Sequence, residues 1–95
     1  MTPSVTALAL RSALARIAEV ACGKRPSSLT TVANVTAGEP IYLVLVDIDH
    51  RAALCRYLAS HLSITPAMGN ADQILFSQAE ATKIIAGTAT QYKAP

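Results

Sequence analysis

The feature that most constrains this chain is a run of six apolar residues, Ile41 to Val46, which ends at Asp47. The run is far shorter than the roughly 20 residues of a membrane span and follows the turn residues 37–40, so it predicts a buried strand. Successive side chains of a strand point to opposite faces, so both faces of this strand are apolar. We therefore expect a central strand that is covered on both sides, or covered on one side and joined to another copy of the chain on the other.

A second strand is predicted before the turn, because residues 30–36 are rich in β-branched Thr and Val. The four turn residues between the two runs favour an antiparallel hairpin. A short third strand is expected over residues 73–76, which follow a loop over residues 63–72.

Three helices are predicted, over residues 3–22, over residues 50–62 and from residue 78 onward. Gly23 would end the first helix as a left-handed cap residue, and Asp49 would cap the second. Ser77 and Glu80 match the capping box that begins the third helix. Apolar residues recur at helical spacing on the expected inner faces, namely Leu8, Leu10, Leu14, Ile17, Val20 and Ala21, then Ala53, Leu54, Tyr57, Leu58 and Leu62, then Ala81, Ile84, Ile85 and Ala89.

The predicted element order is α-β-β-α-β-α within a single α/β domain of residues 1–95. The unit from Ile41 through the second helix to Phe76 is interpreted as a right-handed βαβ crossover between parallel strands. With so few elements, we expect an α/β (α+β) two-layer sandwich whose short sheet is mixed.

The composition limits how much of the surface of this fold can be polar. The 95 residues are 52% hydrophobic and 15% charged, with no Trp and one Phe, so the core is mainly aliphatic and polar cover for the surface is limited. We therefore expect self-association or a face covered by a partner. Cys22 and Cys55 follow no disulfide or zinc pattern, which predicts reduced, buried cysteines in a cytoplasmic protein. No secretory signal and no membrane-spanning segment are expected.

The net charge of +2 includes four basic residues in the N-terminal quarter, against one acidic residue. The basic residues are Arg11, Arg16, Lys24 and Arg25. Basic residues concentrated on one face are typical of nucleic-acid binders, and Arg51 and Arg56 would extend such a surface. The aromatic residues of a platform for single strands are missing from this region, so ordinary solvated charges are the competing interpretation.

Two carboxylates, Asp47 and Asp49, follow the central strand. Ligands of open α/β sheets bind beyond the carboxyl ends of strands, and carboxylate oxygens are ligands for Mg²⁺. The run from Tyr42 to Asp49 resembles the first motif of haloacid-dehalogenase-type phosphatases, an apolar strand followed by Asp-x-Asp. That resemblance implies a magnesium-dependent phosphoryl site, although His50 and Arg51 stand where the family has small Gly or Thr residues. The structural alternative is that Asp47 ends the strand and Asp49 caps the helix.

Nucleophilic chemistry would need Cys55 together with His50 or His61. A Cys nucleophile requires a base within reach, and residues five or six positions apart point to different faces of a helix. We therefore interpret Cys55 as a core residue and both histidines as surface residues. The chain contains no Gly-rich phosphate loop.

The sequence combines coherent fold signals with no complete catalytic set. We therefore expect a non-enzymatic protein–protein interaction module: an adaptor, regulator or inhibitor of the kind that phages and mobile elements encode. We expect a protein partner, no cofactor and no metal, and the alanine-rich first helix would allow a homodimer. The alternatives are a nucleic-acid-binding protein that uses the basic N-terminal segment and a minimal Mg²⁺-dependent phosphoryl enzyme at Asp47 and Asp49. The expected contact residues are Arg11, Arg16, Lys24, Arg25, Asp47, Asp49, His50 and Arg51.

Overall fold

The computed structural model describes residues 5–91, and it describes the side chains of residues 5–35, 38–70 and 72–88. Its helices are α1 (Val5–Cys22), α2 (Ile48–Leu62) and α3 (Gln78–Gln91), with a short 3₁₀ helix over Asn70–Asp72. Its strands are β1 (Leu29–Ala37), β2 (Glu39–Val46), β3 (Ala67–Met68) and β4 (Ile74–Ser77). None of the described helices is long and apolar enough to cross a membrane. The predicted order of elements is confirmed, with β3 and the 3₁₀ helix added where a loop was expected.

The four strands form one antiparallel sheet in the order β1-β2-β4-β3. The predicted hairpin of β1 and β2 is confirmed, and Gly38 at its turn has a φ of +97°, which glycine adopts without strain. The predicted parallel crossover is wrong, because β2 and β4 pair antiparallel with Tyr42 opposite Phe76. The chain is thus a small two-layer α/β (α+β) domain, as expected, but the described strands contain no parallel pair.

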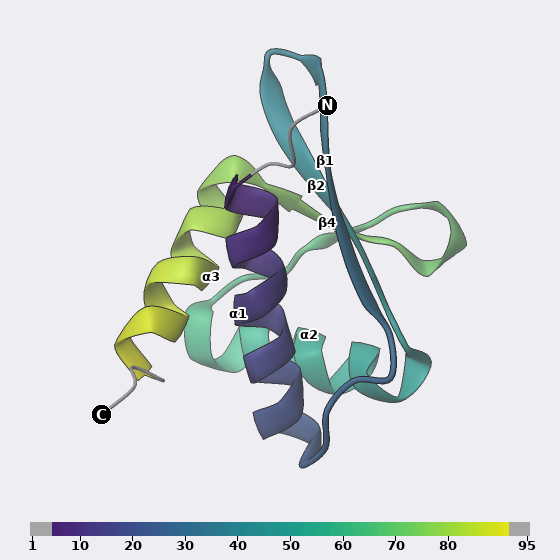
Figure 1. The fold of residues 1–95 in the computed structure, drawn as a ribbon, viewed down its shortest axis with the longest axis vertical. Helices are drawn as coiled ribbons and strands as arrows, with labels where there is room; N and C mark the ends of the chain where they lie inside the picture. The colour runs from purple at the N-terminus through teal and green to yellow at the C-terminus, as the bar shows by residue number, and fades with distance from the viewer. Residues whose placement is uncertain (1–4, 92–95) are drawn as a thin grey trace.

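The position of α2 explains this antiparallel pairing. In a parallel crossover, the helix runs back along the sheet and returns the chain to the starting end of the first strand. Here α2 crosses beyond the end of the sheet at which β2 finishes, and it packs mainly against α1 (Figure 1). The chain therefore re-enters the sheet from that same end, and Ile74 at the start of β4 pairs with Val44 near the end of β2.

The helices lie on one side of the sheet, which Figure 1 shows nearly edge-on. Along β2, Tyr42 and Val44 are buried beneath the helices, whereas Ile41 and Leu45 are exposed. Of the two arrangements predicted for the central strand, the structure therefore has cover on one face only. The core is mainly aliphatic, as expected, and its largest buried members include Leu10, Leu14, Ile17, Val44, Leu54, Leu58, Ile74, Phe76 and Ile84.

Local signals at two helix ends are confirmed. Gly23 follows α1 with a φ of +79°, and its N–H donates to the Glu19 carbonyl oxygen at 2.7 Å. At the start of α3, the Glu80 N–H donates to Ser77 Oγ at 3.1 Å and the Ser77 N–H donates to Glu80 Oε1 at 2.9 Å. This is the reciprocal capping box that the sequence predicts. The predicted beginning of the first helix at Pro3 lies outside the described residues.

Two apolar residues that were placed on the inner face of the first helix, Leu8 and Val20, are exposed. The buried stripe of α1 instead includes Ala7 and Ala18, and the helix packs against both α2 and α3. In α3, an added Cβ at Gly87 would approach Leu62 Cδ2 to 2.9 Å. Small residues thus allow the three helices to approach each other closely on one side of the sheet.

Candidate functional site

The side of the sheet that faces away from the helices carries an apolar surface, here called the outer apolar face, which consists of Val32, Ile41, Leu43, Leu45 and Leu75. Val32, Leu43 and Leu75 are paired across β1, β2 and β4, and Ile41 and Leu45 flank Leu43 at alternate positions of β2. The exposed fractions are 57% for Val32, 47% for Ile41 and 44% for Leu45. These side chains are exposed because the helices cover only the opposite face of the sheet.

Most immediate neighbours of the outer apolar face are uncharged, and the charged residue Glu39 lies at its border, at the alternate position of β2 next to Ile41. Thr30 lies opposite Leu45, and Asn34 and Ser77 lie opposite Ile41 on the two neighbouring strands. A solvated face of an antiparallel sheet ordinarily carries polar side chains. A continuous exposed apolar surface is instead characteristic of a contact surface.

β1 is an edge strand, and its nine residues include no charged residue and no proline. Edge strands are usually protected by such residues against pairing with another chain. The Asp47 N–H donates to the Ser28 carbonyl at 3.2 Å, so the carbonyl group of Ser28 points toward β2. Because the direction of the backbone groups alternates along a strand, those of Leu29 and Thr31 point away from β2. Arg11 Nε donates to the Leu29 carbonyl at 3.2 Å and so covers the beginning of this edge.

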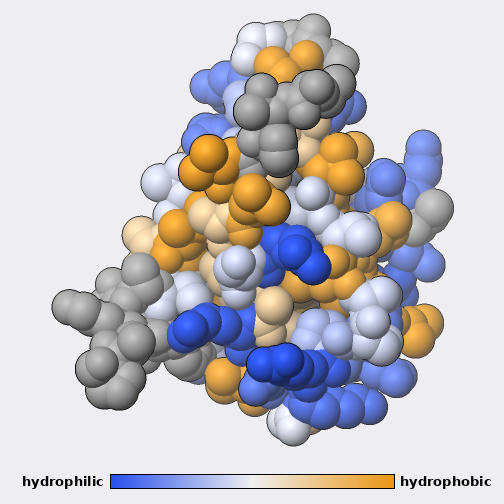
Figure 2. Space-filling model, in the orientation of Figure 1, coloured by the Kyte–Doolittle hydropathy of each residue, from blue (hydrophilic) through white to orange (hydrophobic). Residues whose placement is uncertain are grey.

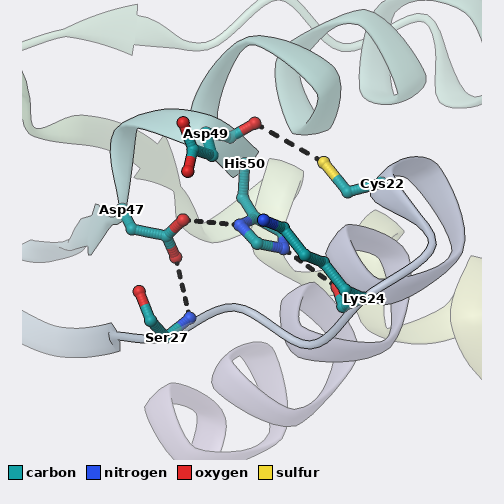
Figure 3. Close-up of polar contacts among 6 residues, drawn as sticks. All are labelled: Cys22, Lys24, Ser27, Asp47, Asp49 and His50. Carbon is teal, nitrogen blue, oxygen red and sulfur yellow. Dashed lines mark hydrogen bonds and ion pairs between the residues drawn. The ribbon is translucent and has the colours of Figure 1, made fainter.

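A second cluster of polar side chains lies at the junction of β2 and α2 (Figure 3). Asp47 Oδ2 lies 2.5 Å from His50 Nδ1, and Asp47 Oδ1 accepts a hydrogen bond from the Ser27 N–H at 3.0 Å. His50 Nε2 lies 2.9 Å from the carbonyl oxygen of Lys24. The imidazole therefore joins the carboxylate to the segment between α1 and β1, and the junction holds these two parts of the chain together.

Both hydrogen-bond partners of His50 are acceptors, so an imidazole that is protonated on both ring nitrogens can donate to both of them. The hydrogen bond to Asp47, followed by that to the Lys24 carbonyl, raises the pKa of His50 above 6.5. The hydrogen bond from His50 is also the main cause that lowers the pKa of Asp47 below 3.8. His50 is only 1% exposed, so the prediction that it is a surface residue is wrong. Because it is buried, the imidazole is not accessible to an external substrate.

Asp49 lies in the first turn of α2 and is not its cap, because the helix begins at Ile48 and Asp47 occupies the N-cap position. The predicted capping role of Asp49 is therefore wrong. Asp47 makes no capping hydrogen bond with its side chain, since its two oxygens are engaged by His50 and Ser27. Within the part of the chain that the structure describes, no three His, Cys, Asp or Glu side chains gather closely enough to hold a metal ion.

The cysteines are only partly buried, whereas the sequence predicted full burial. Burial is the main cause that raises the pKa of Cys55, which opposes formation of the thiolate that a nucleophile requires. His61 stacks on Tyr57 with 4.0 Å between ring centroids. Cys22 donates from Sγ to the Asp49 carbonyl oxygen at 3.5 Å.

The structure brings together three of the basic residues expected to contact a ligand. Arg11, Arg16 and Arg25 line one hollow between α1 and the segment that follows it. Lys24 contributes its carbonyl oxygen to His50, and Arg51 forms an ion pair with Asp72 at 3.1 Å. The candidate contact residues therefore divide between this hollow and the β2–α2 junction.

No family model, no curated protein and no solved structure matches this chain. The pairing of Asp47 with His50 was missed by sequence reasoning, although an acidic residue three positions before a histidine at a helix start was an available signal.

Proposed function

We propose that this protein is a non-enzymatic interaction module, an adaptor, regulator or inhibitor that binds a partner protein through the outer apolar face. The exposure of Val32, Ile41 and Leu45 together on the uncovered face of the sheet carries this proposal. Removal of apolar area from water is the main favourable contribution to protein association. The partner surface that meets Val32, Leu43 and Leu45 is expected to be apolar, because a charge buried there without a counter-charge is costly.

The side chains that could take part in catalysis also support a binding role. The oxygens of Asp47 and the ring nitrogens of His50 are engaged in contacts that connect two segments of the fold. The raised pKa of Cys55 disfavours its thiolate. The exposed polar groups near the outer apolar face include those of Thr30, Asn34 and Glu39, which suit the polar rim of a protein interface.

Site-specific photocrosslinking in the native cells tests this function. A photoreactive residue in place of Leu45 would lie on the outer apolar face, and the same residue in place of Val20 would occupy a comparably exposed position on α1. We expect an adduct with one other protein from position 45 and none from position 20. Addition of Ile41→Lys is expected to abolish that adduct, because the charge would have to be buried in the interface.

Three results would contradict the proposal. They are the absence of any adduct from position 45, the same adducts from position 20, and an adduct that contains only two copies of this chain. The last result would assign the outer apolar face to self-association. Once the partner is identified, Ile41→Thr is expected to weaken its affinity about tenfold, which corresponds to about 1.4 kcal/mol.

A further inference from the structure

A hollow of about 400 Å³ lies between α1 and the segment that connects it to β1. A second hollow of about 310 Å³ adjoins it and shares Arg16, Glu19 and Arg25 with it. Sites for small ligands usually measure about 300–1,000 Å³. The larger hollow, here called the arginine cleft, is lined on its polar side by Arg11, Ser12, Arg16, Glu19, Arg25 and Ser27.

The arginine cleft is built from one helix face and one fixed segment. Ser12, Ala15, Arg16 and Glu19 follow the three- and four-residue spacing that places side chains on one face of α1. The small side chains of Ser12 and Ala15 leave the space between the longer ones. The opposite wall begins at Arg25, after α1 has ended at Gly23 and the chain has turned back.

That opposite wall is held by the β2–α2 junction. Asp47 accepts a hydrogen bond from the Ser27 N–H, and His50 is bonded to the Lys24 carbonyl oxygen. Figure 2 shows hydrophilic side chains gathered over the C-terminal half of α1, where this wall begins. The cleft is therefore a polar surface whose two sides are positioned by the fold.

The charges of the arginine cleft favour an anion. Its lining includes three arginines and one glutamate, which gives a net charge of 3 − 1 = +2. Arg25 Nε lies 3.3 Å from Glu19 Oε2, but these side chains are 88% and 51% exposed, so solvent screens their attraction. Arg11 donates to the Leu29 carbonyl from Nε, which is one of the five N–H donors of its guanidinium group.

We infer that the arginine cleft binds the phosphate group of a small phosphorylated molecule of nucleotide size. The planar guanidinium group donates two parallel hydrogen bonds to phosphate, and the hydroxyls of Ser12 and Ser27 add further donors. A phosphomonoester carries a charge of about −1.5 to −2 at neutral pH, which complements the charge of the cleft.

The observations favour a compact ligand over a nucleic-acid strand. A strand is bound by a groove of cations that follows its backbone and by aromatic side chains that stack on its bases. The residues that line the cleft include no aromatic side chain, and Arg51 on α2 is paired with Asp72. The phosphate group is therefore the part of the ligand that the cleft recognises.

Calorimetric titration of the full chain at low salt tests this inference. The probes are a nucleoside 5′-monophosphate, the same nucleoside without phosphate, and a single-stranded oligonucleotide. We expect saturable binding of the monophosphate with a Kd of about 1 mM or tighter, and no binding of the nucleoside. Arg16→Gln and Arg25→Gln are each expected to weaken binding about tenfold, whereas Glu19→Gln is expected to strengthen it, because a like charge has been removed.

Arg56→Gln on α2 is the matched control, because it removes one positive charge from an exposed residue that does not line the cleft. We expect this variant to bind the monophosphate as the unaltered chain does. An equal loss in Arg56→Gln would show that only net charge matters and would overturn the inference. Failure of the monophosphate to bind, equal binding of the nucleoside, or binding of the oligonucleotide alone would also overturn it. Thermal unfolding of each variant separates a lost site from a lost fold.

Discussion

The imidazole of His50 lies 2.5 Å from the carboxylate of Asp47, and this contact joins three parts of the chain. Asp47 directly follows β2, and His50 belongs to the first turn of α2. Asp47 is bonded to Ser27 and His50 to Lys24, and both of these residues lie in the segment between α1 and β1. The same contact that orients α2 therefore holds one wall of the arginine cleft. Protonation of His50 therefore favours the contacts that hold these three parts of the chain together.

We predict that the protein is more stable at about pH 6 than at about pH 9. The pKa of His50 is raised above 6.5 in the folded state, so between pH 6.5 and that raised pKa the folded protein holds a proton that the unfolded chain releases. The contribution of His50 to stability is therefore complete below pH 6.5 and is lost as the pH rises through its folded-state pKa. The nearby charge of Lys24 opposes the shift in part. Thermal unfolding across this range measures the effect.

The matched variants for this pH dependence are His50→Gln and His61→Gln. His50→Gln is expected to be less stable at about pH 6 and to lose most of the decline toward about pH 9. His61 is exposed, so His61→Gln should keep the decline. An unchanged pH profile in His50→Gln would refute the role assigned to this imidazole. At the acidic end, the lowered pKa of Asp47 predicts a further loss of stability as the pH falls below 3.8.

Substitution by Thr is predicted to destabilise the protein much more at Val44 than at the neighbouring Leu45 of β2. Val44 is fully buried beneath the helices, so Val44→Thr places a hydroxyl in the core and should cost about 1–3 kcal/mol. Leu45 belongs to the outer apolar face, so Leu45→Thr should change the free energy of unfolding by less than about 1 kcal/mol. It should also reduce binding of a hydrophobic dye. Equal destabilisation in chemical denaturation would mean that both faces of β2 are covered.

The hydroxyl of Thr31 on β1 is buried, and it has no hydrogen-bond partner among the described residues. Thr31→Val keeps the shape of the side chain and removes the unsatisfied group, so it should stabilise the protein by about 1 kcal/mol. Thr30→Val on the exposed side of the same strand should change the stability by less than about 0.5 kcal/mol. Urea denaturation of the two variants checks this, and a destabilised Thr31→Val would indicate that the hydroxyl does have a partner.

The capping box of α3 is predicted to matter more than an ordinary side-chain contact in the same helix. Ser77→Ala removes the acceptor of the Glu80 N–H and should cost about 1 kcal/mol. Thr82 is exposed and bonds back to the Gln78 carbonyl, so Thr82→Ala should be neutral within about 0.5 kcal/mol. Equal free energies of unfolding for the two variants would argue against the cap.

The contents of the candidate site were only partly predictable. The apolar run Ile41–Val46 indicated a strand with two apolar faces, but periodicity does not say which face the helices cover. The basic residues were visible in the sequence, but their meeting in one cleft depends on how the segment after Gly23 turns back along α1. His50 was misplaced on the surface, because its burial depends on Asp47, Lys24 and the direction in which α2 leaves the sheet.

The sequence by itself determined the end of α1 at Gly23, the capping box at Ser77, and the hairpin of β1 and β2. These features depend on residues within a few positions of each other, so local geometry and hydrogen bonding suffice to specify them. Only the tertiary structure decided that β4 pairs antiparallel with β2, that the outer apolar face stays uncovered, and that His50 is buried. Each of these depends on α2 packing against α1 instead of along the sheet, a contact between segments distant in sequence that local patterns do not encode.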